Sequence, residues 1–176
     1  MSPKELKQKK LEDTHKALMT LMANEKIEDI SITELCDLAG VSRTYFYHHF
    51  TSMDDVISEF QVSSIVAYMR ALPSKQILDL STMMQHYFRL NQESYEDTLI
   101  LIRAGKESVL IKAFKSVYLY LFDKNRISKS QLTNNKYWAD FIAGAVVNMM
   151  VAWLQDGMTE SATAMGENVA KFLSRN

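Results

Sequence analysis

The chain has 176 residues, a formal net charge of −1 and a single cysteine. A chain of this length buries about 70% of its unfolded surface, so its stability requires neither a metal nor a disulfide framework. Two prolines, five glycines and many Met, Leu, Lys and Glu residues favour an all-α fold. No apolar run reaches the ~18 residues of a membrane span, and the N-terminus lacks the apolar segment of a signal peptide. We therefore expect a cytoplasmic protein that does not enter a membrane.

The first predicted helix runs from Pro3 to about Asn24, since proline suits the first helical position, where its missing N–H costs nothing. Lysines crowd its first part. Such a run is more often a solvated helix end than a contact site, but beside a DNA-binding motif it can reach phosphate. The lysines are Lys4, Lys7, Lys9 and Lys10.

Two helix starts and one tight turn fall within residues 31–50. Ser31 followed by Glu34 predicts a capping box, in which each side chain bonds the backbone N–H of the other residue. Gly40 can adopt the positive φ that ends a helix within one residue. Ser42 then provides a second N-cap. This spacing predicts a helix-turn-helix, which sets its second helix into the DNA major groove.

The second helix of this motif is expected over residues 43–49. Phe46 and Phe50 lie four positions apart and should point inward, and Cys36 is small enough to pack beneath the turn. An ordinary helical hairpin would explain the turn alone. The aromatic and hydroxyl side chains left outside favour DNA binding instead.

Charge limits how this unit can bind DNA. Residues 1–50 contain seven lysines and arginines against eight aspartates and glutamates. Bulk attraction to phosphate should therefore be weak, and binding must depend on local placement of a few side chains.

Residues 30–60, with the motif SITELCDLAGVSRTYFYHHFTSMDDVI, resemble the N-terminal domain of the TetR family of bacterial transcription regulators. The resemblance implies a three-helix DNA-binding head over residues 1–52. It also implies an all-helical ligand-binding and dimerisation body over residues 53–176, with about nine helices in all. The family usually has a lysine at the start of the fourth helix, where this chain has Met53, Asp54 and Asp55.

Helical periodicity continues through the body. Ser94 with Asp97 predicts one helix start, Gly105 predicts a stop, and Ser161 caps the last helix. The polar stretch 123–135 is the longest predicted loop. Helices are expected over about 53–72, up to 93, 95–104, 107–122, 136–155 and from 162 onward.

The helix predicted over residues 136–155 is apolar on nearly all sides, so it must be covered on both faces. One cover is its own core, and we expect the other to be a second subunit. The last two helices resemble the dimerising four-helix bundle of the TetR family, and the WLQDGMTES stretch resembles the C-terminal type frequent in Firmicutes. The predicted dimer residues are Phe141, Gly144, Ala145, Met149, Trp153, Met165, Val169 and Phe172.

No pattern for catalysis, cofactor binding or metal binding is present, so we expect no enzyme activity, no cofactor and no metal. His48 and His49 are adjacent and diverge by about 100° on a helix, which prevents both from binding one metal. Apolar and hydroxyl side chains of the body could line an effector cavity. The candidates are Tyr87, Phe88, Tyr118 and Trp138.

Residues and resemblance together predict a ligand-responsive repressor that binds a near-palindromic DNA operator as a homodimer. We expect Arg43 to bind guanine and Thr44 and Tyr45 to contact bases or thymine methyl groups. Several other side chains are expected to bind DNA phosphates. Two alternatives stay open: a TetR-like co-activator or partner-binding regulator with weak DNA affinity, and a small helical ligand-binding protein or enzyme. The remaining candidate DNA contacts are Ser31, Ser42, Tyr47, His48, His49, Lys4 and Lys7.

Overall fold

The structure, a computed structural model, describes residues 2–71, 79–127 and 135–173. Within these ranges the chain forms nine helices and no strand, which confirms the predicted all-α class. The predicted helix end at residue 72 and most of the predicted 123–135 loop lie outside them. The helices are α1 (Pro3–Met22), α2 (Ile32–Ala39), α3 (Arg43–His49), α4 (Met53–Ala71), α5 (Leu80–Glu93), α6 (Tyr95–Arg103), α7 (Glu107–Asp123), α8 (Trp138–Gln155) and α9 (Ala162–Leu173).

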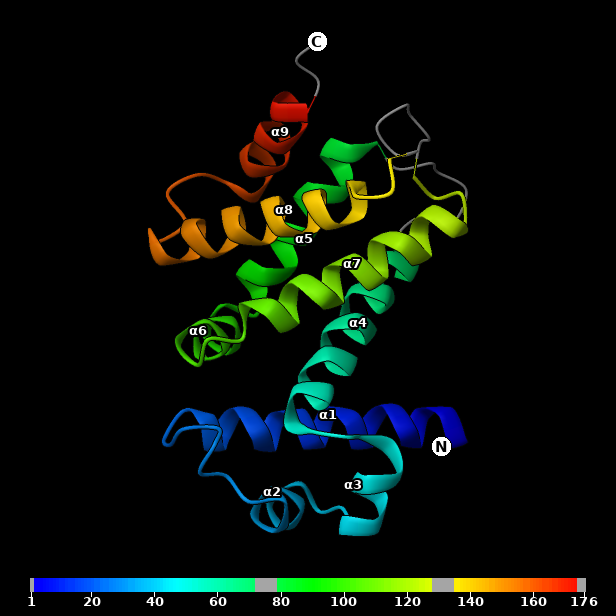
Figure 1. The fold of residues 1–176 in the computed structure, drawn as a ribbon, viewed down its shortest axis with the longest axis vertical. Coiled ribbons are helices and arrows are strands. Elements are labelled where there is room, and N and C mark those ends of the chain that lie inside the picture. Colours follow the sequence, from blue (N-terminus) through cyan, green and yellow to red (C-terminus); the bar gives the residue numbers. More distant parts are fainter. Residues whose placement is uncertain (1, 72–78, 128–134, 174–176) are drawn as a thin grey trace.

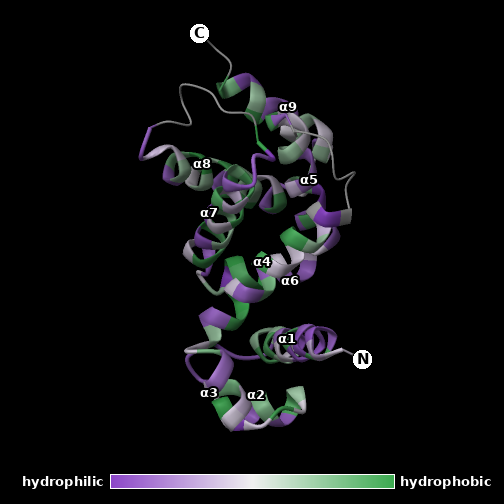
Figure 2. Cartoon of the chain, turned by 90° about the vertical axis from the view of Figure 1, so that its right-hand side faces the viewer, coloured by the Kyte–Doolittle hydropathy of each residue, from purple (hydrophilic) through white to green (hydrophobic). Residues whose placement is uncertain are grey.

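Helices α1, α2 and α3 form a small unit at one end of the molecule, which we call the head (Figures 1 and 2). Helix α4 packs on α1 at its start and on α7 further along, so it connects the head to the remaining helices, the body. The boundary predicted after residue 52 coincides with the start of α4 at Met53. Whether head and body are separate domains stays a prediction.

Backbone capping explains why the head helices begin and end where they do. Ser31 Oγ accepts from the N–H of Glu34 at 3.1 Å, and Ser42 Oγ accepts from Tyr45 at 3.0 Å. Gly40 has φ of 65°, as the tight turn requires. Of the capping box predicted at Ser31, the structure describes the bond from the Glu34 N–H to the Ser31 hydroxyl but not the return bond from the Ser31 N–H to the Glu34 carboxylate. That prediction was therefore half right.

A complete capping box forms instead at the N-terminus. Ser2 Oγ accepts from the N–H of Glu5 at 3.3 Å, and Glu5 Oε2 accepts from the N–H of Ser2 at 2.7 Å. The Ser-x-x-Glu spacing was present in the sequence and would have predicted it.

Two details of the predicted helix starts in the body were wrong, although α6 begins at Tyr95 as expected. Ser94 makes no side-chain cap for α6, because its hydroxyl donates to the Leu90 carbonyl of the preceding helix at 2.9 Å. Helix α8 begins at Trp138, two residues later than expected. The cap that opens α5 is Asp79, whose carboxylate accepts from the Thr82 N–H at 2.9 Å.

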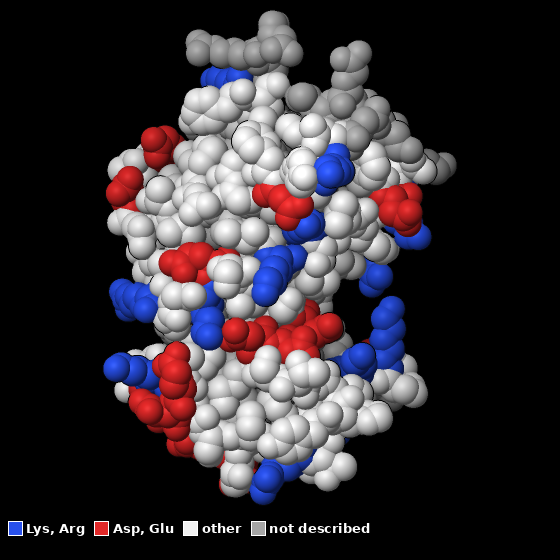
Figure 3. Space-filling view, viewed as in Figure 1, with Lys and Arg blue, Asp and Glu red and all other residues white. Residues whose placement is uncertain are grey.

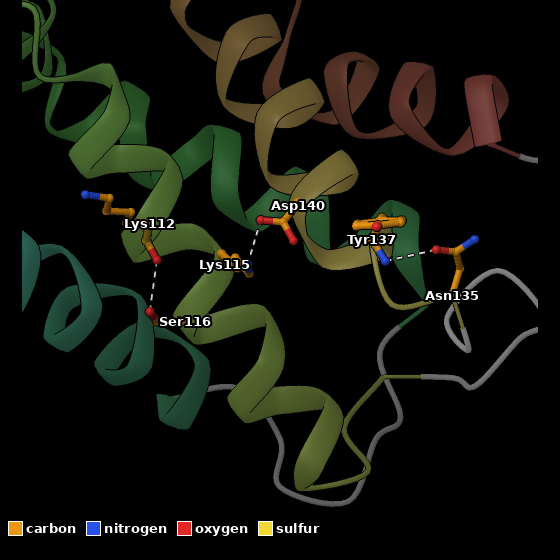
Figure 4. A network of polar contacts seen from close by, with 6 residues as sticks. All are labelled: Lys112, Lys115, Ser116, Asn135, Tyr137 and Asp140. Carbon is orange, nitrogen blue, oxygen red and sulfur yellow. Dashed lines mark hydrogen bonds and ion pairs between the residues drawn. The ribbon is translucent and has the colours of Figure 1, made fainter.

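Two helix pairs hold the body together, α5 with α9 and α7 with α8. Helix α9 packs on α5 so closely at Gly166 that an added Cβ would lie 2.6 Å from the Gln85 backbone nitrogen. Helices α7 and α8 pack together and are joined on their outer side by the Lys115 to Asp140 ion pair, 2.6 Å long (Figure 4).

Among the described helices, α8 alone is long and apolar enough to cross a membrane by length and composition. That evidence is weak, because the core helix of a globular protein meets the same criteria. Here α8 supplies core residues such as Ile142, Val146 and Met150, each fully buried within the chain.

Candidate functional site

Helix α3 presents most of its side chains to solvent. Phe46 is fully buried and Phe50 is 6% exposed, as predicted, so these two rings fix the helix on the head core. Arg43, Thr44 and His48 are exposed, and Tyr47 is 60% exposed. The outer surface of α3 is therefore free to enter a DNA groove.

Ser31 and Ser42 are exposed at the starts of α2 and α3. Their hydroxyl oxygens accept backbone N–H groups as N-caps. Each hydroxyl still has its own proton to donate, so a DNA phosphate remains a suitable acceptor for both.

Tyr45 differs from its neighbours on α3 because it is half-buried between α3 and α1. The Lys10 Nζ lies 4.4 Å from the centre of the Tyr45 ring. The centroids of the Tyr45 and His49 rings are 4.3 Å apart. Burial raises the pKa of the Tyr45 hydroxyl. The structure thus places Tyr45 as a platform between two helices, and its predicted contact with bases stays a prediction.

Helix α1 places lysines beside α3. Lys4 and Lys7 are exposed. Burial lowers the pKa of His49, and the charges of His48, Lys7 and Lys10 lower it further, which shows that these lysines face His49 electrostatically. Lys10 belongs to the lysine run that was expected to reach phosphate but was not among the specific candidate contacts, although its spacing of three from Lys7 places both lysines on one helix face.

The start of α4 carries acidic side chains that are already engaged. Asp54 pairs with Lys106 of the body at 2.8 Å. The Asp55 carboxylate accepts from the Thr51 N–H at 3.0 Å and from the Thr51 hydroxyl at 3.2 Å. The first residues of α4, Met53, Asp54 and Asp55, therefore offer a phosphate no lysine or arginine of their own. On the face seen in Figure 3, basic side chains are scattered among acidic ones rather than forming one basic surface.

An apolar cavity lies between α4, α5 and α7 in the body. Tyr87 and Tyr118 line it, as predicted for an effector cavity. Phe88 does not line it, because its ring packs edge-on against Trp153 with centroids 5.4 Å apart. Trp138 is set behind the wall, where its Nε1 donates to the Tyr118 hydroxyl at 2.7 Å. The lining residues are Ile65, Tyr68, Met83, Met84, His86, Tyr87, Leu90, Phe114, Val117, Tyr118 and Leu121.

The polar groups that sequence reasoning missed in this cavity are His86 and Tyr68, which contact each other. The His86 Nδ1 is 2.9 Å from the Tyr68 hydroxyl, and burial with the charge of Arg89 lowers the pKa of His86. The cavity encloses about 30 Å³. Sites for drug-sized ligands enclose about 300–1,000 Å³, so this cavity must widen before it can hold an effector.

The predicted dimer residues divide into two groups. Phe141 and Phe172 are 57% and 70% exposed. Gly144, Ala145 and Met149 are half-buried. The prediction was wrong to place three others, Trp153, Met165 and Val169, at the surface, because the chain buries them in its own core. Met165 and Val169 lie on α9, which packs on α5, and Trp153 of α8 packs edge-on against Phe88 of α5.

In the described part of the chain, no group of three or more His, Cys, Asp or Glu side chains is arranged to hold a metal ion. Cys36 is free and buried, which agrees with a packing role, and burial raises its thiol pKa.

An exposed short helix on a helix-turn-helix, joined by one long helix to an all-helical body, defines a helical regulator fold. A family model of the TetR regulators, described as a transcriptional regulator C-terminal region, matches residues 75–175, more than half of the chain. The chain therefore belongs to this family of transcriptional regulators. No curated protein matched the chain at a significant level.

Solved structures share the fold at low sequence identity. Lin0861 from Listeria innocua has a TM-score of 0.75 at 18% identity, covering 99% of this chain and 96% of that one. The dihydroxyacetone kinase operon activator DhaS has a TM-score of 0.57 at 15% identity, covering 93% of both chains. The fatty acid degradation regulator FadR from Bacillus halodurans has a TM-score of 0.50 at 13% identity, covering 98% and 95%. At these identities the likeness concerns the fold alone.

Proposed function

We propose that the protein is a ligand-responsive transcriptional repressor of the cytoplasm that binds a near-palindromic DNA operator as a homodimer. The observation that carries this proposal is the outer surface of α3, where Arg43 and Thr44 are exposed directly after the Ser42 cap. Two copies of α3 would enter successive major grooves, about 34–36 Å apart. The exposed Phe141 of α8 and Phe172 of α9 support the dimer, because large apolar rings left in solvent favour a partner surface.

Arg43 and Tyr47 have different roles in this proposal. Arg43 reads guanine, so Arg43→Ala should weaken operator binding by about 1–3 kcal/mol and relax sequence preference. Tyr47 holds a phosphate, so Tyr47→Phe should weaken binding to operator and random DNA alike.

The measurement is a gel shift with the DNA upstream of the protein's own gene, at fixed salt, against a random duplex of equal length. Equal loss on both duplexes for Arg43→Ala would remove its role as a base reader. Failure of the unaltered protein to shift any duplex would remove the proposed function itself.

Effector binding would act through the cavity between α4, α5 and α7. Because the cavity encloses only about 30 Å³, an effector must push these helices apart. Helix α4 lines it with Ile65 and Tyr68 and also packs on α1, so its displacement moves the head. A change in the distance between the two α3 helices on adding effector would measure this coupling.

A second candidate function is a co-activator or partner-binding regulator with weak DNA affinity. The acidic start of α4 and the excess of acidic residues over residues 1–50 favour it. DhaS, which shares the fold, is itself described as an operon activator. Absence of a shift with every neighbouring promoter, combined with capture of a defined partner protein, would select this alternative.

A further inference from the structure

The backbone of DNA needs a cation beside α3, and the start of α4 cannot supply one. Asp54 is paired with Lys106, and Asp55 is bonded to Thr51. Any phosphate approaching that side meets carboxylates, which repel it. The cation for a phosphate next to α3 must therefore come from another element.

Helix α1 places such a cation at the C-terminal end of α3. Lys10 lies with its Nζ 4.4 Å from the centre of the Tyr45 ring, and the His49 ring is also in contact with Tyr45, with centroids 4.3 Å apart. The cation–π contact holds a flexible lysine in one place, which lowers the conformational entropy lost when it binds an anion. The Tyr45 ring of α3 thus contacts both Lys10 of α1 and His49 of its own helix.

We propose that Lys10 and His49, arranged on the ring of Tyr45, form one binding site for a DNA backbone phosphate, and that His49 takes up a proton when the phosphate binds. This inference rests on the proposed DNA-binding function and adds to it. It assigns Lys10, a residue that reads no base, the role of the phosphate-binding cation for α3.

The proton uptake follows from the charges around His49. The groups facing it are Lys7 and Lys10 from α1, with Tyr45 and His48 from its own helix. Burial and the neighbouring positive charges lower the pKa of His49 in the free protein. A bound phosphate neutralises these charges and favours the imidazolium, so the pKa of His49 rises in the complex.

The sign of the pH dependence is then set by linkage. Because the complex holds the proton more tightly than the free protein, DNA affinity is highest at low pH and falls as pH rises through the pKa of the complex. Each pH unit by which this pKa rises is worth about tenfold in affinity for each protomer.

The test measures binding of a random-sequence duplex at low, fixed salt across the pH range in which histidine titrates. Affinity of the unaltered protein should fall with rising pH. His49→Gln should be weaker at low pH and should lose this pH dependence, whereas His48→Gln should keep it. Titration of the His49 ring by NMR should show a higher pKa with the duplex bound than without it.

Lys10→Met keeps an apolar stem over the Tyr45 ring and removes the charge. It should weaken binding at every pH and reduce the salt slope by about one for each protomer. The matched control is Lys9→Met, because Lys9 lies on the same helix but lines the groove between α1 and α4. It should leave the salt slope unchanged.

Two results would overturn the inference while leaving DNA binding in place. One is a pH-independent affinity of the unaltered protein, and the other is an equal change in salt slope for Lys9→Met and Lys10→Met. Absence of binding to any duplex at any pH would instead overturn the proposed function, and the inference with it.

Discussion

Two junctions in this molecule are built in opposite ways. Where α9 meets α5, backbone lies against backbone: a Cβ added to Gly166 would come within 2.7 Å of the Ser81 carbonyl oxygen. Where the head meets the body, α1 meets α4 through side chains: His15 stacks on Phe60 with ring centroids 3.6 Å apart, and Gln8 Nε2 donates to Ser63 Oγ at 3.4 Å. Grooves of about 360 and 640 Å³ flank that junction.

The difference indicates which parts of the molecule can move. A close backbone contact admits only one arrangement, so α5 and α9 keep the outer face of the body constant. A junction of side chains bordered by grooves can shift at a smaller cost than a contact of backbone against backbone, because side chains can change rotamer as the helices move. For a regulator of the proposed kind, this combines a constant dimer face with a head that can be displaced.

The largest expected effect comes from closing the space at the α5 and α9 contact. Gly166→Ala places a methyl group 2.5 Å from Gln85 Cγ and 2.6 Å from the Gln85 backbone nitrogen, so the helices must separate. Overpacking of this kind should cost about 3 kcal/mol of unfolding free energy. Thermal unfolding followed by circular dichroism should show a melting temperature lower by roughly 6–12 °C.

The matched control is the other helical glycine of the body, Gly144, which has open space around it. Gly144→Ala should keep the melting temperature or raise it, because alanine favours a helix by up to about 1 kcal/mol over glycine. Equal melting temperatures for both variants would contradict the close packing at Gly166. A concentration-dependent fall for Gly144→Ala would indicate close approach across the proposed dimer face.

The next effect concerns His15 at the head junction. It is 2% exposed, its Nε2 has no hydrogen-bond partner, and burial lowers its pKa to about 4 from an ordinary 6.5. Between pH 4 and pH 6.5, His15 therefore binds a proton in the unfolded chain but stays neutral in the folded protein. Stability is complete above pH 6.5 and is lost as pH falls toward 4, by about 2 kcal/mol between pH 7 and pH 5.

His15→Phe removes the titrating group and can keep an aromatic ring stacked on Phe60. Urea unfolding at pH 7 and pH 5 should show this pH dependence reduced by about 2 kcal/mol relative to the unaltered protein. An unchanged difference would mean that other groups cause the acid sensitivity and that the junction tolerates a charged His15.

Sequence reasoning succeeded where the signals are local. Ser42, Gly40 and the Phe46 and Phe50 pair act within a few residues of each other, so the start, turn and buried side of the helix-turn-helix could be predicted without knowing the fold. Ser94 shows the limit of the same approach. Its hydroxyl could bond either the end of α5 or the start of α6. Because the two helices follow each other directly, the hydroxyl donates to the Leu90 carbonyl of α5.

Sites built from distant elements could not be predicted in the same way. Trp153, Met165 and Val169 lie on helices with suitable apolar residues, but periodicity does not say which apolar side meets the same chain and which meets a partner. The packing of α9 on α5 decided that for Met165 and Val169, and the contact with Phe88 of α5 decided it for Trp153. Likewise Lys10 joins Tyr45 only because α1 crosses the end of α3, which depends on tertiary packing.

The smallest expected effect concerns the ion pair that joins the start of the connecting helix α4 to the body, Lys106 to Asp54. Its side chains are 17% and 47% exposed, so a double-mutant cycle with Lys106→Met and Asp54→Asn should give a coupling energy below about 1 kcal/mol. The comparison pair lies inside the body, Lys115 to Asp140, with exposures of 36% and 60%. By unfolding free energy alone the two pairs should be nearly indistinguishable.

Amide hydrogen exchange should separate them, because it reports local opening rather than global unfolding. Lys106→Met removes a link across a junction bordered by grooves, so exchange should quicken in the first turn of α4 and around Gly105. Lys115→Met removes a link between α7 and α8, which are packed together over their length, and exchange there should change little. Equal acceleration in both variants would show that the head junction is as constrained as the body, and would remove the contrast on which a movable head depends.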